Sequence, residues 1–429
     1  MADADLLGRS DRVLADDPDL KWVAGTLIIG AITFNAVLCF INTSVAPIHT
    51  FYVIGSESLI VAIALLACHR TIEPKSVLII GTVLFYTALL AFLRSGISPQ
   101  EGFNLKIIRD FLIPVAFLLL GKAINDIRVA DYTVFVATAL ILAFALFEFF
   151  DLDAFLRVFA VSDYYVARGT IDAFDPSLQW MNGLAPSGMR PPEQGRELLP
   201  FLGNHRVSSL FLEPIGFGNF GCIIVFWAIA RSKMERQVRV WSIAAGIAFI
   251  ILSDTRFNAS FLGVGILILL ISPRLTTPVV LTMPFVIIFW LWLAAANAAA
   301  AVWPFQLGNT LQERLLYSGR VLLDFDVLNW LGIEVSRAPS TADAGYAYII
   351  SNVGLIGLTA FWFWLTSLEG RNRSFYAFRN AIAVYFAVLL CISNSPFTIK
   401  TAALQWFLIG ALSVASDSAR RGMSRLMLK

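Results

Sequence analysis

Residues 22–41, WVAGTLIIGAITFNAVLCFI, form a run of twenty residues without a charged side chain, and this run decides the fold class. A helix of that length is long enough to cross the hydrocarbon core of a bilayer. Eleven similar apolar runs follow it, near residues 51–68, 76–93, 107–124, 131–150, 208–230, 238–253, 257–272, 278–301, 345–367, 377–393 and 398–416. The sequence therefore predicts an all-α, polytopic membrane protein of about twelve transmembrane helices.

The composition supports a membrane protein and excludes several other classes. Of the 429 residues, 58% are hydrophobic and only 14% are charged, whereas soluble proteins contain about 25% charged residues. The charges are confined to short segments, so no basic stripe is available for nucleic acid. The four cysteines, Cys39, Cys68, Cys222 and Cys391, show no metal-ligand spacing, and no nucleotide or hydrolase motif is present. We expect no metal and no other cofactor.

The distribution of Lys and Arg predicts the orientation in the membrane. With the N-terminus inside, the inner segments hold 19 of the 32 basic residues, and the densest clusters are residues 231–239 and the C-terminal tail. The first nineteen residues lack an apolar core, so they are not a cleavable signal. We predict a cytoplasmic tail over residues 1–21, one transmembrane domain over residues 22–416 and a basic cytoplasmic tail over residues 417–429.

Two outer segments, residues 151–207 and 302–344, are much longer than the other connections. Both contain Phe, Tyr and Trp, which argues against disordered spacers. Loops of this length are usually functional, so we expect both segments to be ordered and to carry the working surface.

Several arginines are predicted at the outer ends of the helices, where a permanent cation is costly unless it is paired or hydrated. Arg109 lies in KIIRDFLIP and is either a candidate ligand-binding residue or a helix-end arginine paired with a carboxylate. Arg206 lies in a polar entry to the run 208–230, which suggests a helix that is bent or broken at its outer end. Arg256 follows Asp254 in a tight connection between two apolar runs.

The second long segment adds further candidates. Arg314 and Arg320 lie on the helical-looking stretch QERLLYSGR, and their spacing of six does not place them on one face. Asp343 stands directly before the run 345–367, where it is either an N-cap or a general base. Several arginines on one side of the membrane suit a ligand that bears pyrophosphate, because guanidinium pairs bidentately with phosphate oxygens.

Three acidic residues and one histidine complete the set. Glu213 and His205 flank Arg206 in the sequence and are supporting candidates. Glu57 and Glu148 lie within apolar runs, and their rarity there makes each a functional candidate.

At this point the sequence resembles the Wzy polymerase and O-antigen ligase superfamily of bacterial envelopes. The resemblance rests on KIIRDFLIPVAFLLLGK (106–122), RVSSLFLEPIGFGNFG (206–221), SDTRFNASFLGVGILILL (253–270), LLYSGRVLLDFDVLNWLGIE (315–334) and DAGYAYIISNVGLIGL (343–358). The second and third passages look most like polymerases of exopolysaccharide pathways, such as the xanthan type.

The resemblance implies a glycosyltransferase fold of the multispanning, GT-C-like kind, which acts at the periplasmic face of the inner membrane. It implies an undecaprenyl-diphosphate-linked oligosaccharide as substrate, with partners that regulate chain length and export the polymer. By carry-over, Arg206 and Arg256 would hold the diphosphate, and Arg320 is a weaker match. Where the ligases place a histidine as presumed base, this sequence has Asp343, a departure that favours a polymerase.

Two other functions remain open at this level. One is a ligase that transfers glycan to a lipid A core or to protein. The other is a transporter or flippase, a class in which twelve helices, related halves and deep ionisable residues are common. The halves of this sequence look unlike, and its charges gather at one face.

Overall fold

The computed structural model describes residues 18–97, 105–175, 178, 182–185, 187–190, 195–231, 233–271, 277–298, 310–334 and 343–415. Over these residues the chain is helical and has no strand, and only an isolated bridge joins Met189 to His205. The predicted tail 417–429 and most of the tail 1–21 lie outside the described residues.

All twelve predicted apolar runs fall on helices, with ends that differ by a few residues. These helices are α2 (Pro18–Ser44), α3 (Thr50–Ala67), α4 (Pro74–Ile97), α5 (Leu105–Ile124), α6 (Ile127–Phe150), α9 (Pro214–Ala230), α10 (Arg236–Leu252), α11 (Arg256–Ile271), α12 (Thr277–Ala298), α15 (Gly345–Ser367), α16 (Arg373–Leu389) and α17 (Ile399–Val414). Among the described residues, six helices (α2, α3, α4, α6, α12 and α15) are long and apolar enough to cross a membrane by length and composition. The fold class is therefore all-α with several membrane-length helices, and the number of crossings stays a prediction.

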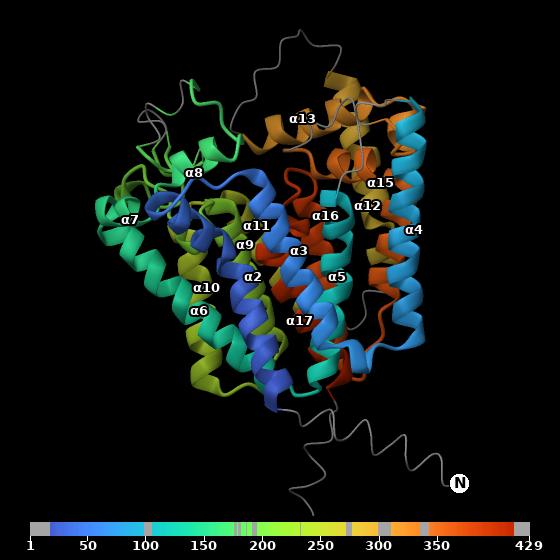
Figure 1. Ribbon diagram of the computed structural model, residues 1–429, viewed down its shortest axis with the longest axis horizontal. Coiled ribbons are helices and arrows are strands. Elements are labelled where there is room, and N and C mark those ends of the chain that lie inside the picture. Colours follow the sequence, from blue (N-terminus) through green and yellow to red (C-terminus); the bar gives the residue numbers. More distant parts are fainter. Residues whose placement is uncertain are drawn as a thin grey trace, which may run out of the picture.

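The two long segments are partly helical. The first contains α7 (Leu152–Val158), α8 (Val161–Ala167) and the short 3-10 helices η3 (Pro200–Leu202) and η4 (Ser209–Phe211), and the second contains α13 (Leu311–Leu323) and α14 (Val327–Trp330). Figure 1 shows α13 at the upper end of the molecule, with α8 below it and α7 at the upper end of α6, whereas α2 begins at the lower end. Lys21 pairs with Asp126 and Arg231 with Asp131 near the ends of α2, α6 and α9. Segments predicted on opposite sides of the membrane thus lie at opposite ends of the bundle.

The predicted bend before α9 is confirmed. Leu212 has a left-handed backbone with φ of 58°, and Pro214 occupies the first position of α9. Proline is well suited to that position, because the first amide groups of a helix have no intrahelical acceptor. The residues before it form η4, which packs against α2 and α6 instead of continuing the helix.

A second break lies inside α15. Gly354 has a φ of 68° and touches Gly332, where a Cβ atom would lie 2.3 Å from the Gly354 amide nitrogen. Arg94 of α4 donates to the carbonyl groups of Gly332 (2.6 Å) and Asn352 (2.5 Å), and the Tyr86 hydroxyl donates to that of Val353 (2.7 Å). The carbonyl groups freed by the break are therefore satisfied by α4, as burial away from water requires.

Helices α5 and α17 pack at the centre of the bundle with their backbones in contact. A Cβ atom at Gly121 would lie 2.1 Å from the Phe407 carbonyl oxygen, and one at Gly410 would lie 2.2 Å from the Leu118 carbonyl oxygen. Small residues allow this approach, which gives dispersion contacts that longer side chains would prevent. The two glycines therefore fix how closely the two helices lie.

We expect Gly121→Leu to separate α5 from α17 and to lower the free energy of unfolding by about 1–3 kcal/mol, the usual cost of overpacking. Thermal unfolding of the purified protein in detergent would measure the effect. Gly81→Leu on α4 is the control, because no atom lies within 4 Å of a Cβ placed there. Equal melting temperatures for the two variants would contradict the packing described.

Candidate functional site

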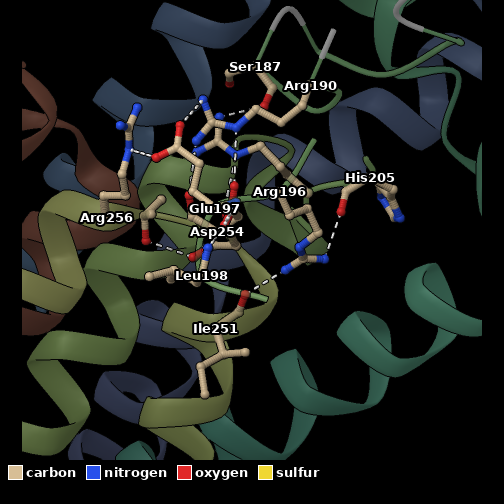
Figure 2. A network of polar contacts seen from close by, with 12 residues as sticks. Ser187, Arg190, Arg196, Glu197, Leu198, His205, Ile251, Asp254 and Arg256 are labelled. Atoms are coloured by element: carbon tan, nitrogen blue, oxygen red, sulfur yellow. Dashed lines mark hydrogen bonds and ion pairs between the residues drawn. The ribbon is translucent and has the colours of Figure 1, made fainter. Parts of the chain in front are cut away.

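The functional candidate site is built on the C-terminal end of α10. The carbonyl groups of residues 251–254 each accept a hydrogen bond from an arginine of the long segment before α9. Arg196 donates to Ile251 (2.5 Å) and Leu252 (2.8 Å), Arg206 donates to Ser253 (3.1 Å), and Arg190 donates to Asp254 (3.4 Å). The last carbonyl groups of a helix lack intrahelical donors and carry partial negative charge, so they attract cations. This attraction fixes the arginine-rich segment over the turn between α10 and α11 (Figure 2).

Asp254 holds the same segment through its side chain. Its Oδ1 accepts from the backbone N–H groups of Glu197 (3.1 Å) and Leu198 (2.9 Å), and its Oδ2 accepts from Nε of Arg190 (3.1 Å). The carboxylate is fully buried. Asp254 adopts a left-handed backbone with φ of 49°, which Asp tolerates better than most residues. The turn thus presents a buried negative charge that is already satisfied by three donors.

Arg206 is a buried cation with only neutral partners among the described residues. Its side chain donates to the carbonyl oxygens of Ser253 and Ser187 (2.9 Å) and is 8% exposed. Burial, together with the nearby charges of Arg190 and Arg314, lowers the pKa of Arg206 to about 9, while the charge of Asp254 opposes this shift. Arg206 remains charged at neutral pH, so an anion beside it would be stabilised.

A cavity of about 240 Å³ opens beside this turn. Four of the residues that line it are arginines, namely Arg190, Arg206, Arg256 and Arg314. The other lining residues are Ser187, Ile215, Asp254, Thr255, Phe257, Asn258, Ser260, Leu311 and Ile392. They come from the long segment before α9, the start of α9, the α10–α11 turn, α13 and the end of α16. Stretches far apart in the sequence therefore form one cationic cavity.

The cavity has an excess of positive charge. Its lining holds four guanidinium groups and one carboxylate, Asp254. Outside the lining, Glu197 pairs with Arg256 and lies 3.6 Å from Arg190. Arg314 makes no ion pair with any residue in the part of the chain that the structure describes. Uncompensated guanidinium groups facing a common space favour an anion with several negative charges.

Part of the cavity lining is polar but uncharged, and it continues into a buried polar cluster. The Tyr385 hydroxyl lies 2.6 Å from Oδ1 of both the lining residue Asn258 and Asn219, and Asn219 donates to Ser395 (2.9 Å). The space for this cluster depends on Gly218, where a Cβ atom would lie 2.3 Å from the Thr255 hydroxyl. The cavity therefore combines a cationic wall with hydroxyl and amide groups below it.

Arg109 lies away from the cavity, in a cluster formed by α3, α5 and α15. It pairs with Glu57 and with Asp110 (2.6 Å), and the Tyr348 hydroxyl donates to Asp110 (2.8 Å). The reading of Arg109 as an arginine paired with a carboxylate is confirmed. Two carboxylates neutralise its charge. Arg109 is also absent from the cavity lining, so the structure does not bring it together with Arg206 and Arg256.

Arg320 and Asp343 also lie outside the cavity lining. Arg320 is on another face of α13 from Arg314, as the spacing predicted, and its Nε lies 3.5 Å from Asp324. Asp343 is exposed. The capping alternative for Asp343 is wrong, because Ala344 occupies the N-cap of α15 and makes no side-chain cap bond. The helix itself begins at Gly345, as the sequence predicted, with Ala344 between it and Asp343.

Glu213 and His205 belong to the supporting structure around the cavity. Glu213 accepts from the Tyr165 hydroxyl (2.7 Å) and lies 3.5 Å from Lys400, which ties α8 to α17. Nε2 of His205 lies 3.0 Å from Glu148, whose buried carboxylate also accepts from the backbone N–H groups of Ser208 and Ser209. Glu148 thus supports the irregular backbone before α9.

Three residues of this site were not predicted from the sequence. Arg190, Arg196 and Glu197 lie in the long segment before α9, which was expected to be functional only as a whole. The available signal was the presence of three arginines, at 190, 196 and 206, within one short Pro- and Gly-containing stretch. A stretch of this composition cannot form a regular helix, so its arginines are free to meet the carbonyl groups of another element.

Comparison of the chain with models of known protein families, with curated proteins and with solved structures finds no match.

We expect Asp254→Asn to destabilise the protein by about 3 kcal/mol, because breaking the buried ion pair leaves Arg190 with only the more distant, partly exposed Glu197 as counter-charge. Asparagine keeps the shape and tolerates the left-handed backbone, so the loss reports the charge. Thermal unfolding in detergent would measure it, with Asp153→Asn on the exposed side of α7 as control. An unchanged melting temperature for Asp254→Asn would refute the role of Asp254 in holding the segment.

Proposed function

We propose that this protein is a membrane-embedded glycosyltransferase that joins undecaprenyl-diphosphate-linked oligosaccharide repeat units into an exopolysaccharide. The reaction takes place at the periplasmic face of the bacterial inner membrane, with both chain termini in the cytoplasm. The observation that carries the proposal is the cavity lined by Arg190, Arg206, Arg256 and Arg314. Part of its lining, Leu311 and Arg314, comes from α13, which lies at the end of the molecule opposite the start of α2 (Figure 1).

A diphosphate suits this cavity for reasons of charge and shape. It carries several negative charges, and each guanidinium group offers a planar pair of donors that matches two phosphate oxygens. The apolar residues Ile215, Phe257 and Leu311 are part of the same lining, and Leu311 is 46% exposed. A lipid-linked diphosphate would thus find both charge neutralisation and a path for its lipid.

The same arginines would support the chemical step. When the sugar is transferred, its bond to the diphosphate breaks and negative charge develops on the departing phosphate oxygen. Guanidinium groups already held in place stabilise that charge without reorganising. The hydroxyl and amide groups of Thr255, Asn258 and Ser260 line the cavity beside them, where sugar hydroxyl groups would find hydrogen-bond partners.

Transport of a lipid-linked sugar is the second candidate. The break in α15 at Gly354 is a feature found in transporters, which use broken helices as binding sites. Here, however, Arg94 and Tyr86 of α4 already bind the carbonyl groups at the break. The neighbouring space, between α4 and α5, amounts to only about 10 Å³. A further alternative is a ligase, which would transfer the glycan from its lipid diphosphate to a lipid A core or to a protein.

We expect Arg314→Gln to lower polymer formation by about a hundredfold, the usual cost of removing one group that stabilises a developing anion. Because Arg314 has no ion pair among the described residues, the melting temperature of the Arg314→Gln variant should hardly differ from that of the parent protein. Polymer from cells that make the variant would be measured on gels, beside the melting temperature of the purified protein. Arg157→Gln, an exposed arginine of α7 at the same end of the molecule, is the control. Normal polymer from Arg314→Gln would count against the proposed diphosphate site.

Incubation of the purified protein in detergent with lipid-linked repeat units separates an enzyme from a transporter. We expect ladders of linked units, since detergent has no two sides between which a substrate could be transported. Gel electrophoresis of the products would show the ladder, and boiled protein is the control. Unchanged single units would contradict the polymerase.

A further inference from the structure

Glu197 differs from the other acidic group at the cavity in what its side chain contacts. Its carboxylate pairs with Arg256 through Oε2 and lies 3.6 Å from Nη1 of Arg190 through Oε1. Both arginines line the cavity. Figure 2 shows the Glu197 side chain between them. The carboxylate therefore occupies a position between two guanidinium groups that line the cavity, where an anionic ligand would also be attracted.

The backbone of Glu197 is fixed while its side chain is partly exposed. Its N–H group donates to the buried Asp254, which anchors the main chain. The side chains of Glu197 and Arg256 are 28% and 42% exposed, so water reaches their ion pair. Such pairs contribute at most about 1 kcal/mol, and a stronger anion can displace one partner without unfolding the segment.

Asp254 is unsuited to such an exchange. It is fully buried, and its two oxygens accept three hydrogen bonds that hold the segment in place. Asp343 is exposed and forms no ion pair with an arginine of the cavity among the described residues. Glu197 lies just outside the lining but contacts two of its arginines, so it is the carboxylate that can both leave its partners and remain near the cavity.

We infer that Glu197 occupies the anion position between Arg190 and Arg256 when the cavity is empty, is displaced when the diphosphate binds, and then accepts the proton of the attacking sugar hydroxyl. The inference rests on the function proposed above. A carboxylate freed from guanidinium partners accepts a proton more readily than a paired one, so the displacement itself prepares the base.

The step balances as a simple substitution. The O–H bond of the acceptor sugar breaks and its proton goes to a Glu197 oxygen. The hydroxyl oxygen forms a bond to the anomeric carbon of the donor sugar. The bond from that carbon to the diphosphate breaks, and the diphosphate leaves with the electron pair, held by the arginines. When it departs, Glu197 releases the proton to water and returns to Arg256.

This dual role predicts opposite effects of one substitution. Glu197→Gln removes the internal competitor, so inorganic pyrophosphate should bind about fivefold tighter, as expected for loss of a partly exposed ion pair. The same change removes the proton acceptor, so ladder formation should fall by about a hundredfold or more. A merely structural role would weaken both binding and turnover.

The test uses the full-length protein in detergent, with calorimetric titration of inorganic pyrophosphate and the ladder assay with lipid-linked units. Glu197→Asp keeps the carboxylate and should restore part of the turnover, which guards against a folding defect. Asp153→Asn has the same change of charge away from the cavity and should alter neither quantity. Arg256→Gln should weaken pyrophosphate binding.

The possible outcomes separate this inference from the proposed function. If Glu197→Gln binds pyrophosphate no tighter than the parent, Glu197 is not a placeholder. If it forms ladders at the parental rate, Glu197 is not the proton acceptor. Either result overturns the inference and leaves the diphosphate site intact, provided that Arg256→Gln binds more weakly. Absence of pyrophosphate binding in the parent would overturn the diphosphate site and this inference with it.

Discussion

The attraction between the carbonyl end of α10 and three arginines is the interaction on which the site depends. Arg190, Arg196 and Arg206 come from a segment with little regular structure, and they meet the carbonyl groups of residues 251–254. A segment with little regular structure has few backbone hydrogen bonds of its own that would fix its position. The end of α10 provides fixed hydrogen-bond acceptors for its arginines. The Asp254 carboxylate determines which residues of the segment lie there, because it accepts from the amide groups of Glu197 and Leu198.

Four arginines in the described part of the chain show how differently such a residue can be partnered. Arg94 binds carbonyl groups at the break in α15, and Arg109 is neutralised by Glu57 and Asp110. The contacts of both arginines therefore stabilise the fold. Arg206 and Arg314 face a common cavity and have no carboxylate partner among the described residues. Burying a cation without a counter-charge lowers stability, and such a cost is usually retained where a ligand supplies the missing charge.

The position of the cavity also explains its mixed lining. It lies where the irregular entry to α9, the start of α11 and α13 meet, so polar backbone and side chains are gathered at one end of an apolar bundle. Gly218 leaves room beneath it for Thr255 and Asn258. A cationic wall above hydroxyl and amide groups suits a ligand with an anionic part and a sugar part, whereas the apolar lining residues suit its lipid.

The sequence by itself determined the fold class and the position of the helices, because a run of about twenty apolar residues has few structures available to it in a bilayer. It also identified the bend at Pro214 and the different faces of Arg314 and Arg320, since both follow from local backbone geometry. It did not determine which arginines share a cavity. Arg109 and Arg206 look alike in sequence, and only the packing of α3 against α5 gives Arg109 the counter-charge of Glu57. Arg190 and Glu197 entered the site only because the tertiary structure brings residues 187–190 and 195–206 onto the end of α10, and contacts between segments so far apart leave no periodic signal in the sequence.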